Sequence, residues 1–175
     1  MAGASAWAGT EPGYSHDSSA KTQHLDWMGD LPDSFKLSYL SVPGTHDTMA
    51  HLGGDAVQTQ SMDLGTQLHS GIRAIDIRIC FTLNTFLLSH GVVVQPGNFE
   101  DVMNTLTQFL SAHPREAVFM RVKQEEDFGG NSYTFEQVFE SFWSRYSEFF
   151  WHGTGTNPSL GESRGKIVVL QDHVL

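Results

Sequence analysis

The sequence predicts an α/β fold assembled from parallel strand–helix–strand units. Five runs have the composition of strands, and they cover 37–42, 72–79, 86–91, 117–123 and 166–171. Helical patterns lie between several of these runs, and strands that alternate with helices are typical of parallel βαβ units. The last run, KIVVLQ, is apolar at its centre, which is typical of a strand that a parallel sheet buries on both faces.

Length and composition set limits on the class of protein. A chain of 175 residues lies within the roughly 100–200 residues expected of one domain. Its 39% apolar and 11% aromatic content can bury a core, which excludes general disorder. The formal charge of −10 excludes nucleic-acid binding through bulk electrostatics. A complete (β/α)₈ barrel needs about 250 residues, so this chain is short of one.

Residues 1–24 are small and polar without a period, so we expect a flexible N-terminal arm ahead of a folded region at 25–175. A single cysteine, Cys80, excludes an intrachain disulfide and favours a reducing compartment. The sequence has neither a signal-peptide pattern nor an apolar run long enough to span a bilayer. We therefore expect a cytoplasmic location, with secretion as the alternative, and only peripheral membrane contact.

The helices and turns are predicted from their end signals. The strand at 37–42 ends at Pro43, and a short helix at 61–70 ends at Gly71, a residue that tolerates the left-handed conformation of a helix stop. A longer helix begins after the N-cap Asn98 and runs to Pro114.

Thr134 and Gln137 form a capping-box pattern that opens a further helix, and 153–161 is rich in Gly, Pro and Asn and is predicted to be a loop.

Side chains that can perform chemistry recur where the predicted strands end. Any one of them has an ordinary structural explanation as a loop or capping residue, but ligands bind at the carboxyl ends of strands in barrels and open α/β sheets. Four successive strand ends present such residues: His46 and Asp47, then Asp76 and Arg78 on one strand face, then His90, then Lys123.

Two histidines with an arginine between them suit the cleavage of a phosphodiester. A neutral imidazole removes a proton from an attacking hydroxyl, and a protonated one supplies a proton to the leaving oxygen. Arg78 can hold the non-bridging oxygens, and Asp47 can orient one imidazole.

A metal site is the chemical alternative, because His46, Asp47, Asp76 and His90 could in principle hold a divalent ion. Arg78 on the same strand face as Asp76 argues against it, since a fixed cation would repel the metal. We therefore predict no metal and no cofactor. The acidic run at 125–127 is predicted to be a solvated loop.

The chain resembles the X region of phosphatidylinositol-specific phospholipase C, in its small bacterial-type form, within the PLC-like phosphodiesterases. The resemblance covers about 25–171 and is carried by LPDSFKLSYLSVPGTHDT, GIRAIDIRI, LLSHG, FLSAHPREAVFMRVK and LGESRGKIVVL. It implies a distorted TIM-type (β/α) barrel. It also implies cleavage of a phosphoinositide lipid, in which the inositol 2-hydroxyl attacks phosphorus and releases diacylglycerol and a cyclic inositol phosphate.

The resemblance also implies roles for individual residues. His46 matches the general base and His90 the general acid, while Asp47 matches the carboxylate paired with that acid. Arg78 matches the phosphate-binding arginine of the metal-independent branch. Asp76 and Lys123 match positions that line the inositol pocket.

Two departures from the family pattern leave alternatives open. Bacterial-type members tend to place a substrate-holding basic residue after KIVVL, where this chain has Gln171 and Asp172. The family also continues for three more strands, so we expect the N-terminal portion of the catalytic barrel, truncated after about five strands. The alternatives are a catalytically silent fragment that binds inositol phosphates or another chain, and a metal-dependent glycerophosphodiester or sphingolipid phosphodiesterase.

Overall fold

The computed structural model describes residues 17–20 and 22–171. Most of the predicted N-terminal arm, and Asp172, lie outside these described residues. Where the arm is described, it touches the folded region: the Ser61 hydroxyl donates to the carbonyl of Asp17, and the His24 amide donates to the carbonyl of His69. No helix in the described ranges is both long and apolar enough to cross a membrane.

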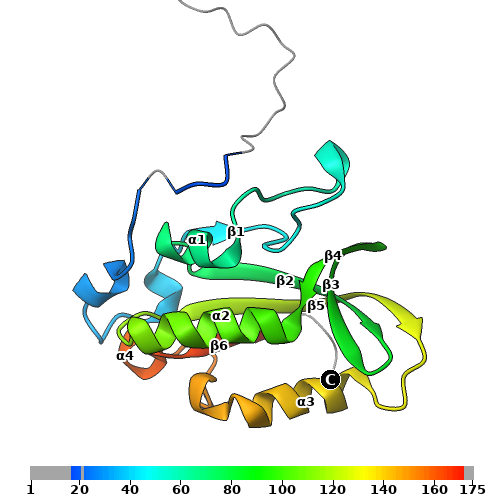
Figure 1. Ribbon diagram of the computed structural model, residues 1–175. Helices are drawn as coiled ribbons and strands as arrows, with labels where there is room; N and C mark the ends of the chain where they lie inside the picture. Colours follow the sequence, from blue (N-terminus) through cyan, green and yellow to red (C-terminus); the bar gives the residue numbers. More distant parts are fainter. Residues whose placement is uncertain (1–16, 21, 172–175) are drawn as a thin grey trace, which may run out of the picture.

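The structure is an α/β fold around one mixed sheet (Figure 1). Its centre is parallel and contains β1 (Gly44–Thr45), β2 (Ala74–Thr82), β5 (Val118–Gly129) and β6 (Ile167–Gln171). Strands β3 (Thr85–His90) and β4 (Val93–Asn98) are antiparallel additions, which gives the order β4-β3-β2-β5-β6 with β1 beside β2. Within the described residues the sheet does not close on itself.

The first predicted strand is wrong in its position. Residues Leu37–Tyr39 form a 3₁₀ turn, and pairing with β2 begins only at Gly44. Pro43 has no amide hydrogen to give to a ladder, but its carbonyl accepts hydrogen bonds from the amides of Arg73 and Ala74. The strand signal at 37–42 therefore reflects apolar side chains that pack under the sheet rather than sheet pairing.

The prediction of parallel units throughout is also wrong for the third strand. Only Leu83 and Asn84 separate β2 from β3, and a two-residue turn can join only antiparallel strands. Both residues have positive φ, 49° and 59°, which is the geometry of a type I′ hairpin turn. Strand β4 was not predicted, because its VVQPGN sequence contains the strand breakers Pro96 and Gly97.

The helix predictions are confirmed by the caps themselves. Helix α1 (Leu64–His69) is followed by Gly71 at φ 106°. Helices α2 (Phe99–Ala112) and α3 (Phe135–Arg145) both open with complete capping boxes. The loop predicted at 153–161 runs into a short helix, α4 (Leu160–Ser163).

The remaining short elements are 3₁₀ turns: η1 (Trp27–Asp30), η2 as above, η3 (Gly54–Ala56) and η4 (Ser147–Phe149).

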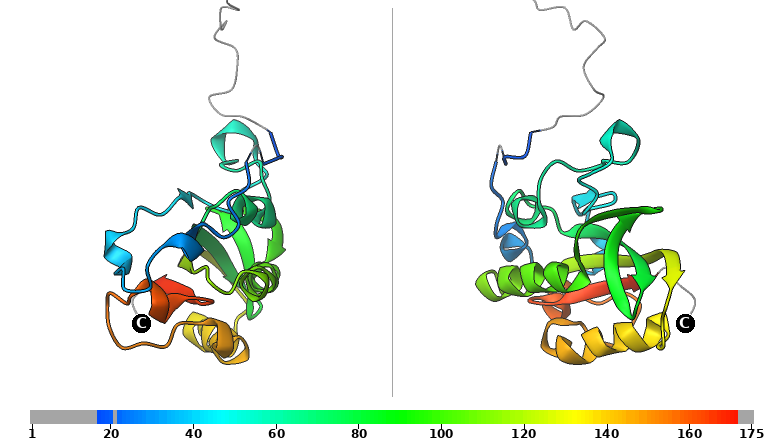
Figure 2. Two further views of the ribbon diagram at one scale, coloured as in Figure 1. Left: turned by 90° about the vertical axis from the view of Figure 1, so that its left-hand side faces the viewer. Right: turned by 45° about the vertical axis from the view of Figure 1, so that its right-hand side comes forward.

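Two apolar clusters cover the two faces of the sheet. Helices α2 and α3 cover one face through an aromatic core that includes Phe86, Phe99 and Phe142. The segment at 27–42 covers the amino-terminal half of the other face, against Phe119 and Val168. Figure 2 shows α2 and this blue segment on opposite sides of the sheet. The carboxyl-terminal half of that second face remains available for polar side chains.

A buried ion pair ties the N-terminal segment to the base of the sheet. Arg73 and Glu116 are both 0% exposed, and Arg73 Nε lies 2.8 Å from Glu116 Oε2. The same guanidinium donates to the carbonyl of Leu25, and Glu116 accepts the amide of Gly29. Burial raises the pKa of Glu116 and lowers that of Arg73, and their mutual attraction opposes both shifts.

We predict that Arg73→Met lowers the free energy of unfolding by about 3–5 kcal/mol, because it leaves Glu116 buried without its partner. Urea unfolding measures this change. The control is Arg145→Met, which removes an arginine from the exposed pair with Glu100 and should cost less than about 1 kcal/mol. Equal losses in the two variants would show that the buried pair has no special role.

Candidate active site

The register between β2 and β5 builds the floor of the site. Asp76 pairs with Arg121, and Arg78 pairs with Lys123, so these four side chains project from the same face of the sheet. The isoleucines between them, including Ile77, belong to the core on the opposite face. The predicted placement of Asp76 and Arg78 on one strand face is confirmed.

His46 and Asp47 lie on a tight turn directly after β1, as the sequence predicted. Asp47 has a φ of 46°, a left-handed conformation that a small polar residue tolerates better than most. The turn is held against β2 because the Thr48 amide donates to the Asp76 carbonyl, and the Asp76 amide donates to Thr48 Oγ1.

Gln67 of helix α1 supports the same turn, accepting from Thr45 Oγ1 and donating to the Thr48 carbonyl. The turn that carries His46 and Asp47 is thus held by hydrogen bonds to β2 and to helix α1.

Arg78 lies at the centre of three carboxylates. Its Nε is 2.8 Å from Asp47 Oδ1, its Nη2 is 3.1 Å from Asp76 Oδ2, and its Nη1 is 3.0 Å from Glu125 Oε1. Only 12% of the side chain is exposed. The three acids come from the β1 turn, β2 and β5, so the guanidinium joins three separate segments of the chain.

Both histidines approach the Asp47 carboxylate. His90 Nδ1 lies 3.0 Å from Asp47 Oδ2, a close polar contact that does not meet the criteria of a hydrogen bond. His46 Nε2 lies 3.8 Å from the same oxygen, and its Nδ1 lies 3.3 Å from Asp76 Oδ2. The His46 side chain is 66% exposed and that of His90 28%, so both can be reached from solvent.

The antiparallel hairpin explains how His90 reaches the site. Leu88 pairs with Ile79, so the chain returns along β2 and brings His90 back towards the middle of that strand. β1 occupies the same edge of β2 lower down, at Ala74 and Ile75. The turn after β1 and the end of β3 therefore meet beside one strand.

Three residues lie deeper within their strands than predicted. Asp76 is near the beginning and Arg78 at the centre of β2, which continues to Thr82, and Lys123 is central in β5, which continues to Gly129. The prediction that they mark strand ends is wrong because both strands extend past the site into the hairpin region, with irregular register near Cys80. Lys123 contacts the site through Glu125, with its Nζ 2.9 Å from Oε1.

Glu125 and Arg121 are site residues that were missed. Glu125 was predicted to lie in a solvated loop, but it is part of β5 and its side chain is 12% exposed. Arg121 Nη1 lies 3.1 Å from Asp76 Oδ1. The signal was present in the sequence, because 121, 123 and 125 are two residues apart and must share a face if the strand continues.

The carboxyl groups differ in their acidity. Burial raises the pKa of Asp47, and this exceeds the opposing attraction of Arg78 and His90. For Asp76, burial also acts to raise the pKa, but the Asp47 amide and Arg78 outweigh it and the pKa is lowered. The pKa of Glu125 is lowered in the same way, because contacts with Lys123 and Arg78 outweigh burial.

Two hollows near the beginning of β5 differ in chemistry. One of about 330 Å³ adjoins the histidines and is lined by His46, Asp76 and Arg121 with apolar walls from Ala74, Phe119 and Leu170.

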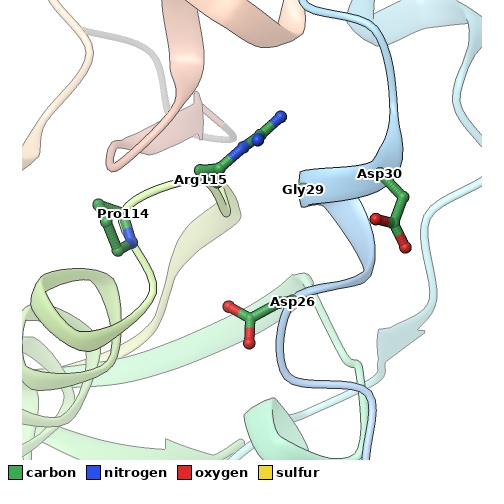
Figure 3. A pocket seen from close by; sticks show the side chains of 5 residues that line it. All are labelled: Asp26, Gly29, Asp30, Pro114 and Arg115. Carbon is green, nitrogen blue, oxygen red and sulfur yellow. The ribbon is translucent and has the colours of Figure 1, made fainter.

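The other, of about 340 Å³, lies at the turn before β5 and is lined by Asp26, Gly29, Asp30, Pro114 and Arg115 (Figure 3). Of the residues with acid–base and phosphate-binding potential, His46 and Asp76 line the first hollow, and Arg78 contacts the Asp76 carboxylate.

No group of three or more His, Cys, Asp or Glu side chains within the described ranges is arranged to hold a metal ion. The carboxylates that could have done so, Asp47 and Asp76, instead face the Arg78 guanidinium. The arrangement provides two imidazoles beside a fixed cation, which is suited to general acid–base chemistry on a phosphate ester.

We predict that Asp76 contributes stability that is lost in acid. Because the pKa of Asp76 is lower in the folded protein, the unfolded chain binds more protons as the pH falls below about 4. The stabilisation by Asp76 is therefore complete above that pH. It disappears as the pH falls through the pKa of Asp76 in the folded protein. The stability difference between wild type and Asp76→Asn, from urea unfolding at several pH values, should shrink towards low pH. Asp47→Asn should show the opposite trend because the pKa of Asp47 is raised. Parallel pH curves for all three proteins would contradict this prediction.

Comparison with known proteins identifies the family. Residues 41–173 match the family described as "Phosphatidylinositol-specific phospholipase C, X domain". The chain is 36% identical over 159 residues to a 1-phosphatidylinositol phosphodiesterase of Listeria monocytogenes, which covers 84% of this chain and 48% of that protein. It is 31% identical over 166 residues to the enzyme of the same name from Staphylococcus aureus strain Newman, covering 89% and 53%.

Solved structures agree with these relatives. The N254Y/H258Y double mutant of the S. aureus phosphatidylinositol-specific phospholipase C matches with a TM-score of 0.78 and 30% identity, over 84% of this chain and 52% of that chain. The L. monocytogenes enzyme matches with a TM-score of 0.73 and 34% identity, over 86% and 57%. The predicted TIM-barrel type of fold is thereby confirmed, although the chain spans about half the length of the curated relatives it matches. The chain belongs to the phosphatidylinositol-specific phospholipase C X-domain family.

Proposed function

We propose that this chain carries the acid–base and phosphate-binding groups of a metal-independent phospholipase C acting on phosphatidylinositol-type lipids. The observation that carries the proposal is the single cluster in which Arg78 and Asp47 lie between two accessible imidazoles, His46 and His90. The relatives named 1-phosphatidylinositol phosphodiesterase support the choice of substrate.

The proposed reaction is an intramolecular displacement at phosphorus. His46 takes the proton from the inositol 2-hydroxyl, and that oxygen forms a bond to phosphorus. The bond from phosphorus to the diacylglycerol oxygen breaks, and His90 gives its proton to this leaving oxygen. The products are diacylglycerol and a cyclic inositol phosphate, and no co-reactant is consumed.

Arg78 and Asp47 have supporting tasks in this reaction. The guanidinium is held in place before substrate binds, so it can stabilise charge on the non-bridging oxygens without reorganising. Asp47 orients the His90 imidazole through the contact at 3.0 Å.

The charge of the site suits a phosphodiester. Three basic side chains contact three carboxylates, so their positive and negative charges cancel. The basic side chains are those of Arg78, Arg121 and Lys123, and the carboxylates are those of Asp47, Asp76 and Glu125. Protonation of His90 then adds the one positive charge that a phosphodiester anion requires.

We also propose peripheral contact with a lipid surface. Large apolar side chains are exposed beside the histidines: Val92 follows the β3 end, and Leu52 is held to β4 by Gln95. With a formal charge of −10, the chain should depend on apolar rather than electrostatic attraction. One solved S. aureus relative was described in connection with its membrane binding.

A second candidate is an inositol-phosphate-binding chain without turnover. This candidate needs only the phosphate-binding cation, Arg78, and neither of the two imidazoles. Binding of inositol phosphates without release of product would support this candidate.

We predict that the protein releases a cyclic inositol phosphate from phosphatidylinositol vesicles in the presence of EDTA, as followed by ³¹P NMR. His46→Gln and His90→Gln should each lower the rate by at least about 100-fold, the usual range for a lost general acid or base. The control His113→Gln, which removes a histidine paired with Asp26 far from the site, should leave the rate unchanged. Activity that appears only with a divalent ion would instead indicate the metal-dependent phosphodiesterase.

Arg78→Lys should reduce kcat by about 100-fold or more, because an ammonium cannot reproduce the forked geometry of the guanidinium. Steady-state kinetics on the same vesicles measures this loss. An Arg78→Lys protein with wild-type kcat would exclude a role for Arg78 in stabilising the transition state.

A further inference from the structure

Strand β5 presents a second guanidinium to the site. Arg121 is in register with Asp76, and its Nη1 lies 3.1 Å from Asp76 Oδ1. The other oxygen of the same carboxylate contacts Arg78 Nη2 at 3.1 Å. Asp76 therefore holds two guanidinium groups side by side on one face of the sheet, and the mechanism above uses only one of them.

The hollow beside His46 lies on the Arg121 side of this carboxylate. Among the described residues that line this hollow, Arg121 is the one with an arginine or lysine side chain. Its side chain is 36% exposed. The apolar walls, which include Phe119 and Leu170, leave Arg121, Asp76 and His46 as the charged or titratable groups facing the space. A ligand in the hollow can therefore reach the Arg121 guanidinium.

The direction of the proposed reaction places part of the substrate here. The attacking hydroxyl must lie at His46, and the phosphorus must lie near Arg78. The hollow of about 330 Å³ adjoins His46, so it offers space for the ring that carries this hydroxyl.

We propose that Arg121, together with Asp76, binds hydroxyl groups of the substrate's headgroup ring and thereby determines which headgroup the site accepts. This inference rests on the proposed function and deepens it. The ligand class is a polyhydroxylated ring that carries a single phosphodiester.

The pairing of charges favours hydroxyls over a second phosphate. A hydroxyl both donates and accepts hydrogen bonds, so it can accept from the Arg121 guanidinium while donating to the Asp76 carboxylate. A phosphate group can only accept in its ionised form, and the Asp76 carboxylate beside it would repel it.

The test is the binding of two small ligands to the full chain by isothermal titration calorimetry. myo-Inositol 1-phosphate has both the ring and the phosphate, whereas glycerol 3-phosphate has a phosphate without the ring. We expect Arg121→Met to weaken binding of the inositol ligand about tenfold, as for the loss of one charge-assisted hydrogen bond. Binding of glycerol 3-phosphate should change by less than about twofold.

Arg115→Met is the matched control. It removes the same type of side chain from the separate hollow at the turn before β5 (Figure 3) and should leave both affinities unchanged.

Each other outcome overturns the inference in a distinguishable way. Equal weakening of both ligands by Arg121→Met would show that Arg121 binds phosphate or acts only by holding Asp76. An unchanged affinity for myo-inositol 1-phosphate in Arg121→Met would remove Arg121 from the headgroup site and leave the proposed function standing. If wild type binds neither ligand, the proposed function fails and the inference fails with it.

Discussion

The ion pairs of the Arg78 guanidinium are the constraint on which the site depends. Its three carboxylate partners come from the turn after β1, from β2 and from β5, so one side chain joins segments that are far apart in sequence. Three carboxylates this close would repel one another without a central cation. Arg78 fixes the Asp47 carboxylate, and this carboxylate in turn contacts His90. The His90 imidazole is therefore held close to the Arg78 guanidinium.

The fold brings these groups together by dividing one edge of β2 between two strands. β1 pairs with the beginning of β2, and β3 returns antiparallel along its end, so His46 and His90 arrive at the same point from opposite directions. The parallel pairing of β2 with β5 then adds Lys123 and Glu125 from the other edge. The large apolar core packs on the opposite face of the sheet, so the polar side chains of the site do not interrupt its packing.

Sequence reasoning succeeded where the signal is local. Capping boxes at Asn98 and Thr134 depend on residues three apart, and the alternation of Asp76 with isoleucines depends on one strand. It failed where tertiary context decides. Leu83 in a left-handed hairpin turn is not a recognisable turn signal, so the antiparallel return was not predicted. Glu125 sits in an acidic run that looks solvated, and only the length of β5 shows that it faces Arg78.

The most direct test of the account observes the cluster itself while a ligand binds. ¹⁵N NMR can follow Arg78 Nε and the imidazole nitrogens of His46 and His90 during a titration with myo-inositol 1-phosphate. If the phosphate is recognised by this cluster, these signals should shift together with one dissociation constant, while the buried Arg73 at the base of the sheet does not respond. Binding that shifts other signals and leaves Arg78 and both imidazoles unchanged would contradict the central claim.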